Sequence, residues 1–454
     1  MIIQEEILTL NGKYMGVTCS LRIARGTNAS SPPQDYNFPM RILVLGWMVL
    51  FLHILLYAQA AASAGPKTVT VSAAIDHNRV IIPVQVRLPD GSTQNVRAWV
   101  DNGNPALYLS RRLATVLGLN VTCGQQECSA PPPAEIAIGG MTISLSDAKV
   151  AKIPLRPVNA ASVLALGMNA EINIPSITLR HYDVLVDFPE HKFSIGQPGT
   201  LHFLGSSSKV QINAENGLIQ VPSEIERKKY SLALDLGACI SFLSDELFTK
   251  LATAHPDWPH MTGAVGSANM WGADDEAKWQ VMRVDRVQYG PLFLTNVPFV
   301  SLAKPVMDFF EKRAGMTTTG LIGSEVLLNY RVGLDYARSM VYFDIGRMYN
   351  FPDFDVVGLV LRPEEDGRYK ILAVADVDGK LSVDGVQAGD HLESVDDIPV
   401  HGATMGQVWS MLGGTPGQER RLTIERGRKS LTVVAKVQQF LGVAADDKEG
   451  KKKR

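Results

Sequence analysis

The stretch WVDNGNPALYLSRRL at residues 99–113 returns in altered form as ALDLGACISFLSDEL at residues 233–247. In both copies an apolar strand ends in Asp-x-Gly, a second apolar run ends in Leu-Ser, and a helical pattern follows that serine, its expected N-cap. The glycine permits a tight turn. Asp101 and Asp235 are therefore each expected at the head of a turn between two buried strands.

A second pair of matching stretches lies at the end of each copy. Residues 174–187 align with residues 322–335, and one more predicted strand follows each stretch. Turn signals rich in glycine, proline and aspartate separate short alternating strands. The sequence therefore predicts a mainly β fold with two related lobes, residues 68–200 and 208–348, each a barrel or a sandwich.

A duplicated lobe that presents one aspartate in each copy predicts a paired site. Two carboxylates brought together cannot both ionise cheaply, so Asp101 and Asp235 are expected to share one proton and to titrate as a unit. The ionised partner can activate a water while the protonated partner polarises a carbonyl, which is chemistry that cleaves peptide bonds. A single Asp-x-Gly is common turn chemistry in β proteins. The second copy at the matching position is what favours catalysis.

These motifs resemble those of the retropepsin-like and pepsin-like aspartic proteases over residues 68–348. The resemblance includes the two Asp-x-Gly turns, GLIG at residues 320–323 and YRVGLD at residues 330–335. It implies two fused, aspartic-protease-like β-barrel lobes that form a cleft. It also implies that Asp101 and Asp235 meet at the floor of that cleft as the catalytic pair.

The same resemblance suggests roles for further residues. It implies that Gly103 and Gly237, in the two turns, lie beside the bound substrate. CGQQEC at residues 123–128 is similar to the small disulfide loop that follows the first catalytic turn in pepsin-like members. It implies a bond between Cys123 and Cys128, while two unrelated thiols are the alternative.

The chain departs from the family pattern at the turns. The family has Thr or Ser after each aspartate, and its hydroxyl bonds across to the opposite lobe; here Asn102 and Leu236 occupy those positions. Asn102 can still donate and accept hydrogen bonds, whereas Leu236 cannot. Pro175 also stands where the second lobe has Gly323 and removes an amide donor. Two functions stay open: an aspartic endopeptidase, or a catalytically impaired protein that holds peptides without cutting them.

A glycine-rich stretch in the second lobe, TGAVGSANMWGADD at residues 262–275, is typical of a mobile hairpin over a cleft. Trp271 is the predicted aromatic of this flap and a candidate substrate contact. A disordered surface loop is the alternative.

A separate C-terminal unit is predicted at residues 354–438, where four motifs resemble, in family order, a PDZ domain of the kind attached to exported bacterial proteases. The motifs lie at residues 358–361 (GLVL), 369–374 (YKILAV), 385–392 (GVQAGDHL) and 412–417 (LGGTPG). The resemblance implies that Gly358, Leu359 and Val360 form a loop whose amides capture a chain-terminal carboxylate. It also implies that a strand edge accepts the peptide by β-addition. A purely structural role is the alternative.

The N-terminal region predicts export. Residues 42–57 form an uncharged apolar run followed by small residues, which is typical of a signal peptide within residues 40–64; a membrane anchor is the alternative. Residues 1–39 are read as a poorly structured leader or a start site placed too early, and residues 442–454 as a charged tail. The mature chain is therefore expected to be periplasmic or secreted, with membrane attachment only through residues 42–57.

The amino-acid composition and the motifs limit the classes of partner that the protein is expected to bind. The net charge of -2 over 454 residues gives no support for nucleic-acid binding, which requires clustered positive charge. No sequence motif for a metal, a nucleotide or another cofactor is present. Polypeptide substrates, and peptide C-termini at the PDZ groove, are the expected partners.

Overall fold

The computed structural model describes residues 66–154, 166–346, 354–377 and 380–442. Gly65–Arg454 forms one compact unit, separate from Met1–Ala64. The predicted leader and signal peptide, and nearly all of the predicted tail, lie outside the described residues. Within the described part of the chain, no helix combines the length and the apolar character needed to cross a membrane.

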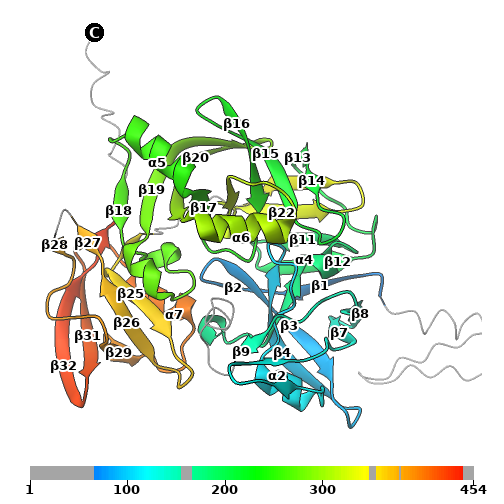
Figure 1. Ribbon diagram of the computed structural model, residues 1–454, viewed down its shortest axis with the longest axis horizontal. Coiled ribbons are helices and arrows are strands. Elements are labelled where there is room, and N and C mark those ends of the chain that lie inside the picture. The colour runs from blue at the N-terminus through cyan, green and yellow to red at the C-terminus, as the bar shows by residue number, and fades with distance from the viewer. Residues whose placement is uncertain (1–65, 155–165, 347–353, 378–379, 443–454) are drawn as a thin grey trace, which may run out of the picture. The chain divides into compact units, whose positions relative to one another are not determined.

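The fold is mainly β, as predicted, and the two sequence repeats form equivalent strand arrangements (Figure 1). In the first, β3 (Arg79–Arg87) pairs with β4 (Thr93–Asp101), and β4 pairs in parallel with β10 (Ile172–Pro175). In the second, β15 (Ile219–Ile225) pairs with β16 (Lys228–Leu234), and β16 pairs in parallel with β21 (Gly320–Ile322). Each predicted aspartate therefore stands at the carboxyl end of a central strand.

The two repeats are joined by a shared six-stranded sheet. Its order is β1 (Thr68–Ser72), β12 (Lys192–Gly196), β11 (Asp183–Asp187), β22 (Tyr330–Asp335), β23 (Met340–Ile345) and β13 (Ser206–Lys209). The central antiparallel pairing of β11 with β22 places one repeat against the other, with Leu185 opposite Gly333. One apolar cluster runs through both repeats, including Val184 and Val332. The exact lobe bounds stay predictions.

The remaining strands complete three sheets around this frame. The first lobe adds β2 (Ala74–Asp76), β7 (Glu135–Ile138) and β8 (Met141–Ser144), and a small sheet of β5 (Thr122–Cys123), β6 (Glu127–Ser129) and β9 (Ile153–Pro154). The second lobe adds β14 (Gln211–Ile212), β17 (Ser241–Ser244), β18 (His260–Thr262), β19 (Gln280–Tyr289) and β20 (Leu292–Leu302).

The helices are short. They are α2 (Arg111–Val116), α4 (Ser176–Leu179), α5 (Asp245–Ala254), α6 (Lys304–Ala314) and α7 (Met405–Leu412), with 3-10 turns η1 (Gly266–Ala268), η2 (Asp274–Lys278) and η3 (Ser324–Val326). The two predicted N-caps are confirmed: the Ser110 side chain accepts a hydrogen bond from the Leu113 amide, and Ser244 accepts one from Leu247.

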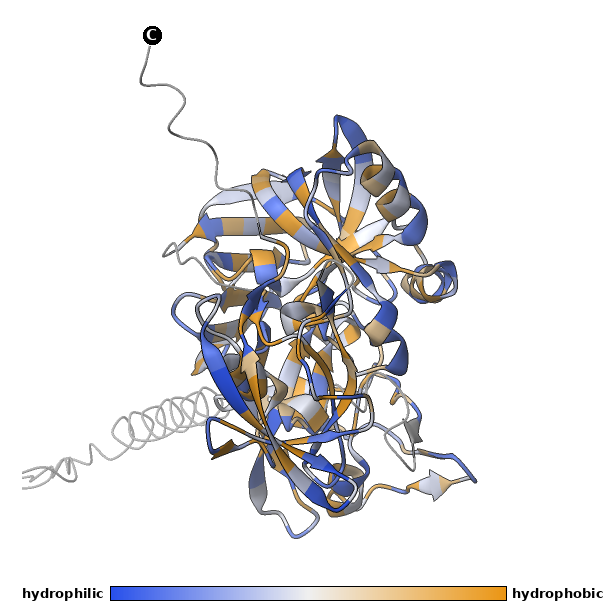
Figure 2. Ribbon diagram, turned by 90° about the vertical axis from the view of Figure 1, so that its left-hand side faces the viewer, coloured by the Kyte–Doolittle hydropathy of each residue, from blue (hydrophilic) through white to orange (hydrophobic). Residues whose placement is uncertain are grey.

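The C-terminal module is a sheet in the order β25 (Leu359–Pro363), β26 (Tyr369–Val374), β29 (His391–Val395), β31 (Glu419–Arg426) and β32 (Lys429–Lys436), with α7 (Figure 1). The short strands β24 (Asp355–Val356) and β33 (Gln438–Gln439) pair together, and β30 (Ile398–Pro399) pairs with β29. The module is not isolated, because β27 (Asp376–Val377), which also pairs with β28 (Lys380–Leu381), continues the second-lobe sheet beside β18. Apolar residues alternate with polar ones along many strands (Figure 2), and one apolar cluster includes both Val281 of the second lobe and Leu361 of the module.

Candidate active site

Asp101 and Asp235 lie next to each other at the ends of equivalent strands. A Cβ atom on Gly237 would lie 2.5 Å from Oδ1 of Asp101 and 3.2 Å from Oδ1 of Asp235, so both carboxylates border one small space. A Cβ atom on Gly103 would lie 2.0 Å from Cγ of Asp235. Any side chain at Gly103 would therefore exclude the second carboxylate. The two predicted catalytic residues and the two predicted glycines meet at one place.

Each carboxylate is oriented by its own lobe. Asn173, on β10, donates from Nδ2 to Oδ2 of Asp101 at 3.0 Å, and its Oδ1 accepts the Tyr108 amide at 2.7 Å. Asp235 instead accepts backbone amides at Oδ1, from Gly237 at 2.8 Å and from Ala238 at 3.1 Å. These bonds fix the two carboxylates facing the shared space.

Asn102 links the two Asp-x-Gly turns across the lobes. Its Nδ2 donates to the Leu234 carbonyl at 2.8 Å, and its Oδ1 accepts the Leu236 amide at 2.7 Å. Asn102 and Leu236 are both fully buried. The sequence predicted that only one side of the usual reciprocal link survives. The structure agrees, and it shows that the asparagine amide makes both of the remaining bonds from that one side.

Burial raises the pKa of both carboxyls. For Asp235, desolvation is the largest cause and the negative charge of Asp101 is the next, and the pKa rises to about 7. Desolvation also raises the pKa of Asp101, against the opposing effects of the Asn173 hydrogen bond and the positive charge of Arg313. Because ionisation of one carboxyl disfavours ionisation of the other, the pair is suited to hold a single proton.

A cavity of about 40 Å³ adjoins Asp235 and Gly103. Phe242, Phe310 and Arg313 are among its other lining residues, and the last two come from α6. This volume holds a few water molecules, since one water needs roughly 10–15 Å³ measured in the same way. It is too small to hold a polypeptide segment in this conformation.

Arg313 places a positive charge beside the two aspartates. It lies in the last turn of α6, and its charge acts on both Asp101 and Asp235. Among the described residues it forms no ion pair within contact distance, and its guanidinium lies 5.8 Å from the Phe309 ring centroid. Burial lowers the pKa of Arg313. The guanidinium is thus a counter-charge to a dyad that carries one negative charge.

A second cation, Arg79 of β3, supports the second Asp turn from the other lobe. It is 1% exposed and donates to the Gly237 carbonyl at 2.9 Å, the Cys239 sulfur at 3.1 Å and the Met270 carbonyl at 3.1 Å. Burial raises the pKa of the Cys239 thiol to about 12. Cys239 therefore remains a thiol at neutral pH, which agrees with the prediction of a small buried apolar residue.

The predicted flap lies in a hairpin of the second lobe. β18 and β19 pair in antiparallel fashion, with Thr262 opposite Gln280, so residues 263–279 are the long connection of a hairpin. This connection contains η1 and η2 and contacts the C-terminal module through Asn269. Trp271 stacks on Phe242, with ring centroids 5.6 Å apart, so it lies behind the cavity wall and does not line the cavity. A flap role for Trp271 as a substrate contact stays a prediction. In this conformation the tryptophan packs on Phe242, a partner that local composition does not reveal.

The predicted carboxylate-binding loop is partly engaged within the module. The Leu359 amide donates to the Val357 carbonyl at 2.8 Å, and the Gly358 carbonyl accepts the Ala375 amide at 2.9 Å. Leu359 and Val360 are buried. Capture of a chain terminus by Gly358, Leu359 and Val360 stays a prediction, and the Leu359 amide is occupied in this conformation.

The Cys123–Cys128 disulfide is present, as the resemblance implied. Three residues of the site were not predicted from the sequence: Asn173, Arg79 and Arg313. Asn173 had a usable signal, since it lies two residues before Pro175 in the stretch that closes the first repeat. Arg79 and Arg313 had none, because ordinary charged residues on a strand and a helix are usually solvated.

Comparison with known proteins yields little. No protein-family model matches the chain, and no curated protein matches it. Among solved structures, an aspartic proteinase from Irpex lacteus is similar with a TM-score of 0.36 and 11% sequence identity, over 62% of this chain and 97% of that one. This is a distant likeness.

Proposed function

We propose that this protein is an exported aspartic endopeptidase that hydrolyses peptide bonds with Asp101 and Asp235. One observation carries the proposal. Two buried carboxylates, from equivalent turns of two repeats, border a single space that Gly103 and Gly237 leave free of side chains. Their raised pKa values support a shared proton near neutral pH.

In this mechanism the pair acts as general acid and general base at once. The ionised carboxylate takes a proton from a water held between the two aspartates, and that water attacks the carbonyl carbon of the substrate. The protonated carboxyl donates to the carbonyl oxygen as negative charge develops there. Asn173 and the amides of Gly237 and Ala238 hold the carboxylates in place, and Asn102 holds the two turns in register.

The proposed substrates are polypeptides in extended form, and the C-terminal module is proposed to bind them as a PDZ-like domain. β25 ends its sheet and pairs with β26 alone among the described strands, so its outer edge is the place where a peptide strand would add. Because the cavity beside Asp235 is too small for a polypeptide segment, substrate entry requires movement of the segments around it.

A peptide-holding protein without catalysis is the second candidate. The observation that favours it is Leu236, which is fully buried where the protease families have a hydroxyl residue. If Asn102 alone cannot keep the carboxylates in register, the protein would bind chains and release them uncut.

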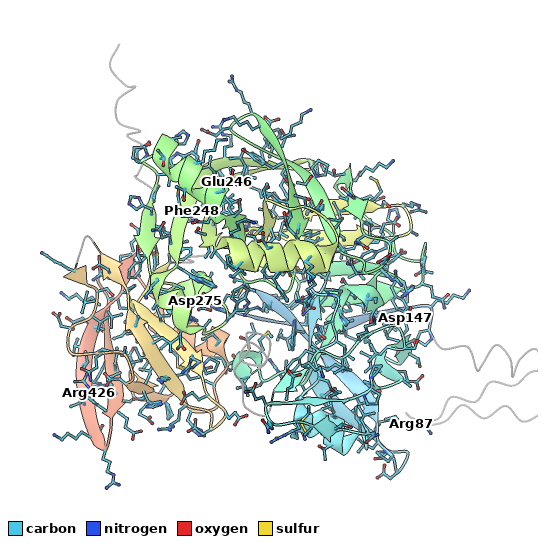
Figure 3. All side chains as sticks on the ribbon, viewed as in Figure 1. Arg87, Asp147, Glu246, Phe248, Asp275 and Arg426 are labelled. Carbon is cyan, nitrogen blue, oxygen red and sulfur yellow. A yellow bond between two sulfur atoms is a disulfide. The ribbon has the colours of Figure 1, made fainter. Side chains whose placement is uncertain are left out.

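The test is cleavage of an unfolded polypeptide, carboxymethylated lactalbumin, from pH 3 to pH 8 by protein obtained through an exporting host. We expect cleavage, and a loss of at least about a thousandfold in Asp101→Asn and Asp235→Asn, since each removes half of the dyad. Asp147→Asn is the control, because the Asp147 side chain is 53% exposed and points to the surface (Figure 3). Absence of cleavage at every pH, or full activity in Asp235→Asn, would exclude the enzyme and leave the peptide-holding protein.

A further inference from the structure

The outer edge of β25, which pairs with no described strand, is contacted by another part of the same chain. Asn269, in the second lobe, donates from Nδ2 to the Leu361 carbonyl at 3.0 Å, and its Oδ1 accepts the Leu361 amide at 2.9 Å. An added antiparallel strand would exchange these same two bonds with Leu361 through its backbone. The Asn269 side chain therefore stands where the backbone of a bound peptide would lie.

The first lobe occupies the end of the same groove. A Cβ atom on Gly167 would lie 3.4 Å from Cβ of Met405, the first residue of α7, and 3.4 Å from Cγ of Pro363, the last residue of β25. Gly167 thus lies between the strand and the helix. The neighbouring Asn169 donates to the Gly402 carbonyl at 3.3 Å. A peptide that runs between β25 and α7 therefore meets Asn269 of the second lobe and Gly167 of the first.

We name residues 266–276 the plug, and Glu276 holds it in shape. Glu276 is fully buried, accepts the Trp271 amide at 2.6 Å and the Ala273 amide at 3.3 Å, and accepts Nδ2 of Asn269. The last bond decides which way the Asn269 amide points, and that orientation is the one that matches Leu361. The Asn269 carbonyl lies 3.0 Å from Nε2 of His77, in the first lobe.

The other side of the plug supports the wall of the cavity. Trp271, two residues after Asn269, stacks on Phe242 and lies 6.4 Å from the Phe310 ring, centroid to centroid. Phe242 and Phe310 both line the cavity beside Asp235. One short segment therefore touches the peptide edge of the module through Asn269 and supports the wall of the cavity through Trp271. Asp275, labelled in Figure 3, marks the plug beside the module.

The plug also lies beside a second cavity. A cavity of about 570 Å³ borders it at Gly266 and Ser267, with Trp409 and Ser410 of α7 among its other lining residues. The plug therefore borders open volume at Gly266 and Ser267.

We propose that the plug blocks the peptide edge of β25, and that an extended peptide which pairs with Leu361 displaces Asn269 and thereby opens the cavity that contains Asp235 to substrate. The occupant is an extended polypeptide that offers one backbone amide and one carbonyl to Leu361, because these are the groups that the Asn269 side chain replaces. The first part of the proposal, that the plug blocks β25 (the blocking half), depends only on the contacts described above. The opening half rests on the proposed protease function.

The blocking half is tested by binding, which requires no catalysis. The probe is a fluorescein-labelled, C-terminally amidated hexapeptide of alternating valine and threonine, so that only strand pairing is measured. Asn269→Ala removes both bonds to Leu361 and is expected to bind the probe at least about tenfold more tightly than the unsubstituted protein. Glu276→Gln keeps the plug residues but replaces the acceptor that orients Asn269, and is expected to tighten binding to a lesser extent.

Asn95→Ala is the matched control, because Asn95 is exposed on β4, away from the plug. Circular dichroism checks that each variant is folded. Equal affinity of Asn269→Ala, Glu276→Gln and the unsubstituted protein would overturn the proposal, since an edge that is already free gains nothing from loss of the plug contacts.

The opening half is tested by cleavage of carboxymethylated lactalbumin with and without the hexapeptide. We expect the peptide to stimulate the unsubstituted protein, and Asn269→Ala to be active without it. Gly167→Cys with Met405→Cys places Cβ atoms 3.4 Å apart, near disulfide spacing, and is expected to remove stimulation until dithiothreitol restores it. The unsubstituted protein in dithiothreitol controls for reduction of Cys123–Cys128. If the peptide binds Asn269→Ala more tightly while cleavage stays equal in every variant, the edge is blocked as proposed but is not coupled to the cavity.

Discussion

Replacement of Asn102 by alanine tests whether one asparagine holds the two lobes in register. The change removes the 2.8 Å bond to the Leu234 carbonyl and the 2.7 Å bond from the Leu236 amide. Both backbone groups would then be left inside a fully buried turn. A buried group without a partner costs about 1–3 kcal/mol, so the two together predict a loss of about 2–6 kcal/mol in the free energy of unfolding.

The assay is a urea titration followed by circular dichroism, with Asn95→Ala, on the strand that precedes Asn102, as control. Because Asn95 is exposed, its substitution is expected to cost less than about 0.5 kcal/mol. Asn102→Thr should recover part of the loss, since one hydroxyl can reach one of the two backbone groups. If Asn102→Ala unfolds at the same urea concentration as Asn95→Ala, the cross-lobe bonds do not stabilise the fold and the account of the turns is wrong.

Two further changes test the carboxylate pair. Gly103→Ala would place a Cβ atom 2.0 Å from Cγ of Asp235, so we expect at least a hundredfold loss of cleavage. Gly124→Ala is the control and should remain active, because its Cβ atom would lie an ordinary 3.6 Å from the nearest atom. Equal activity of the two variants would show that the carboxylates lie farther apart than described. Asp235→Asn tests the raised pKa of Asp235. In the unfolded chain this carboxyl loses its proton above its ordinary pKa of 3.8, whereas in the folded protein it keeps the proton up to about pH 7. The folded protein therefore loses stability as the pH rises from about 4 to 7. The Asp235→Asn variant lacks this loss, so from pH 4 to pH 8 its free energy of unfolding should rise by a few kcal/mol relative to that of the unsubstituted protein. A difference between the two proteins that is the same at both pH values would contradict the raised pKa.

The position of the dyad was predictable because it depends on local backbone geometry that the chain repeats. Each aspartate ends a strand and precedes a glycine, and that sequence alone fixes where the carboxylate stands relative to its own lobe. Asn102 and Leu236 could be recognised as departures, but sequence does not show that the asparagine amide reaches both Leu234 and Leu236. Bond partners in another lobe depend on the register of the lobes, which no local pattern encodes.

The plug shows the opposite case. Its glycines and its tryptophan have the composition of a mobile flap, and nothing within residues 262–275 indicates that Asn269 pairs with Leu361, which lies far along the chain. The burial of Glu276 could not be predicted from the sequence either, because a glutamate that follows two aspartates is typical of a solvated turn. In the structure it is fully buried, and desolvation raises its pKa to about 8. Contacts that join distant parts of the chain determine both features.

The same contacts bear on how the C-terminal module works. A PDZ-like domain on a flexible linker would bring substrate near a protease by tethering alone, and its own core would be complete without the protease. Here one apolar cluster contains Met270 and Trp279 of the second lobe together with Leu361 and Trp409 of the module. The β25 edge, the plug and the wall of the cavity are therefore parts of one packed unit. Packed interiors change between discrete arrangements and resist gradual deformation, so the proposal predicts that a peptide at β25 acts on the site of Asp235 by moving the plug. By linkage, substrate in the cavity then changes the affinity of β25 for peptide to the same extent.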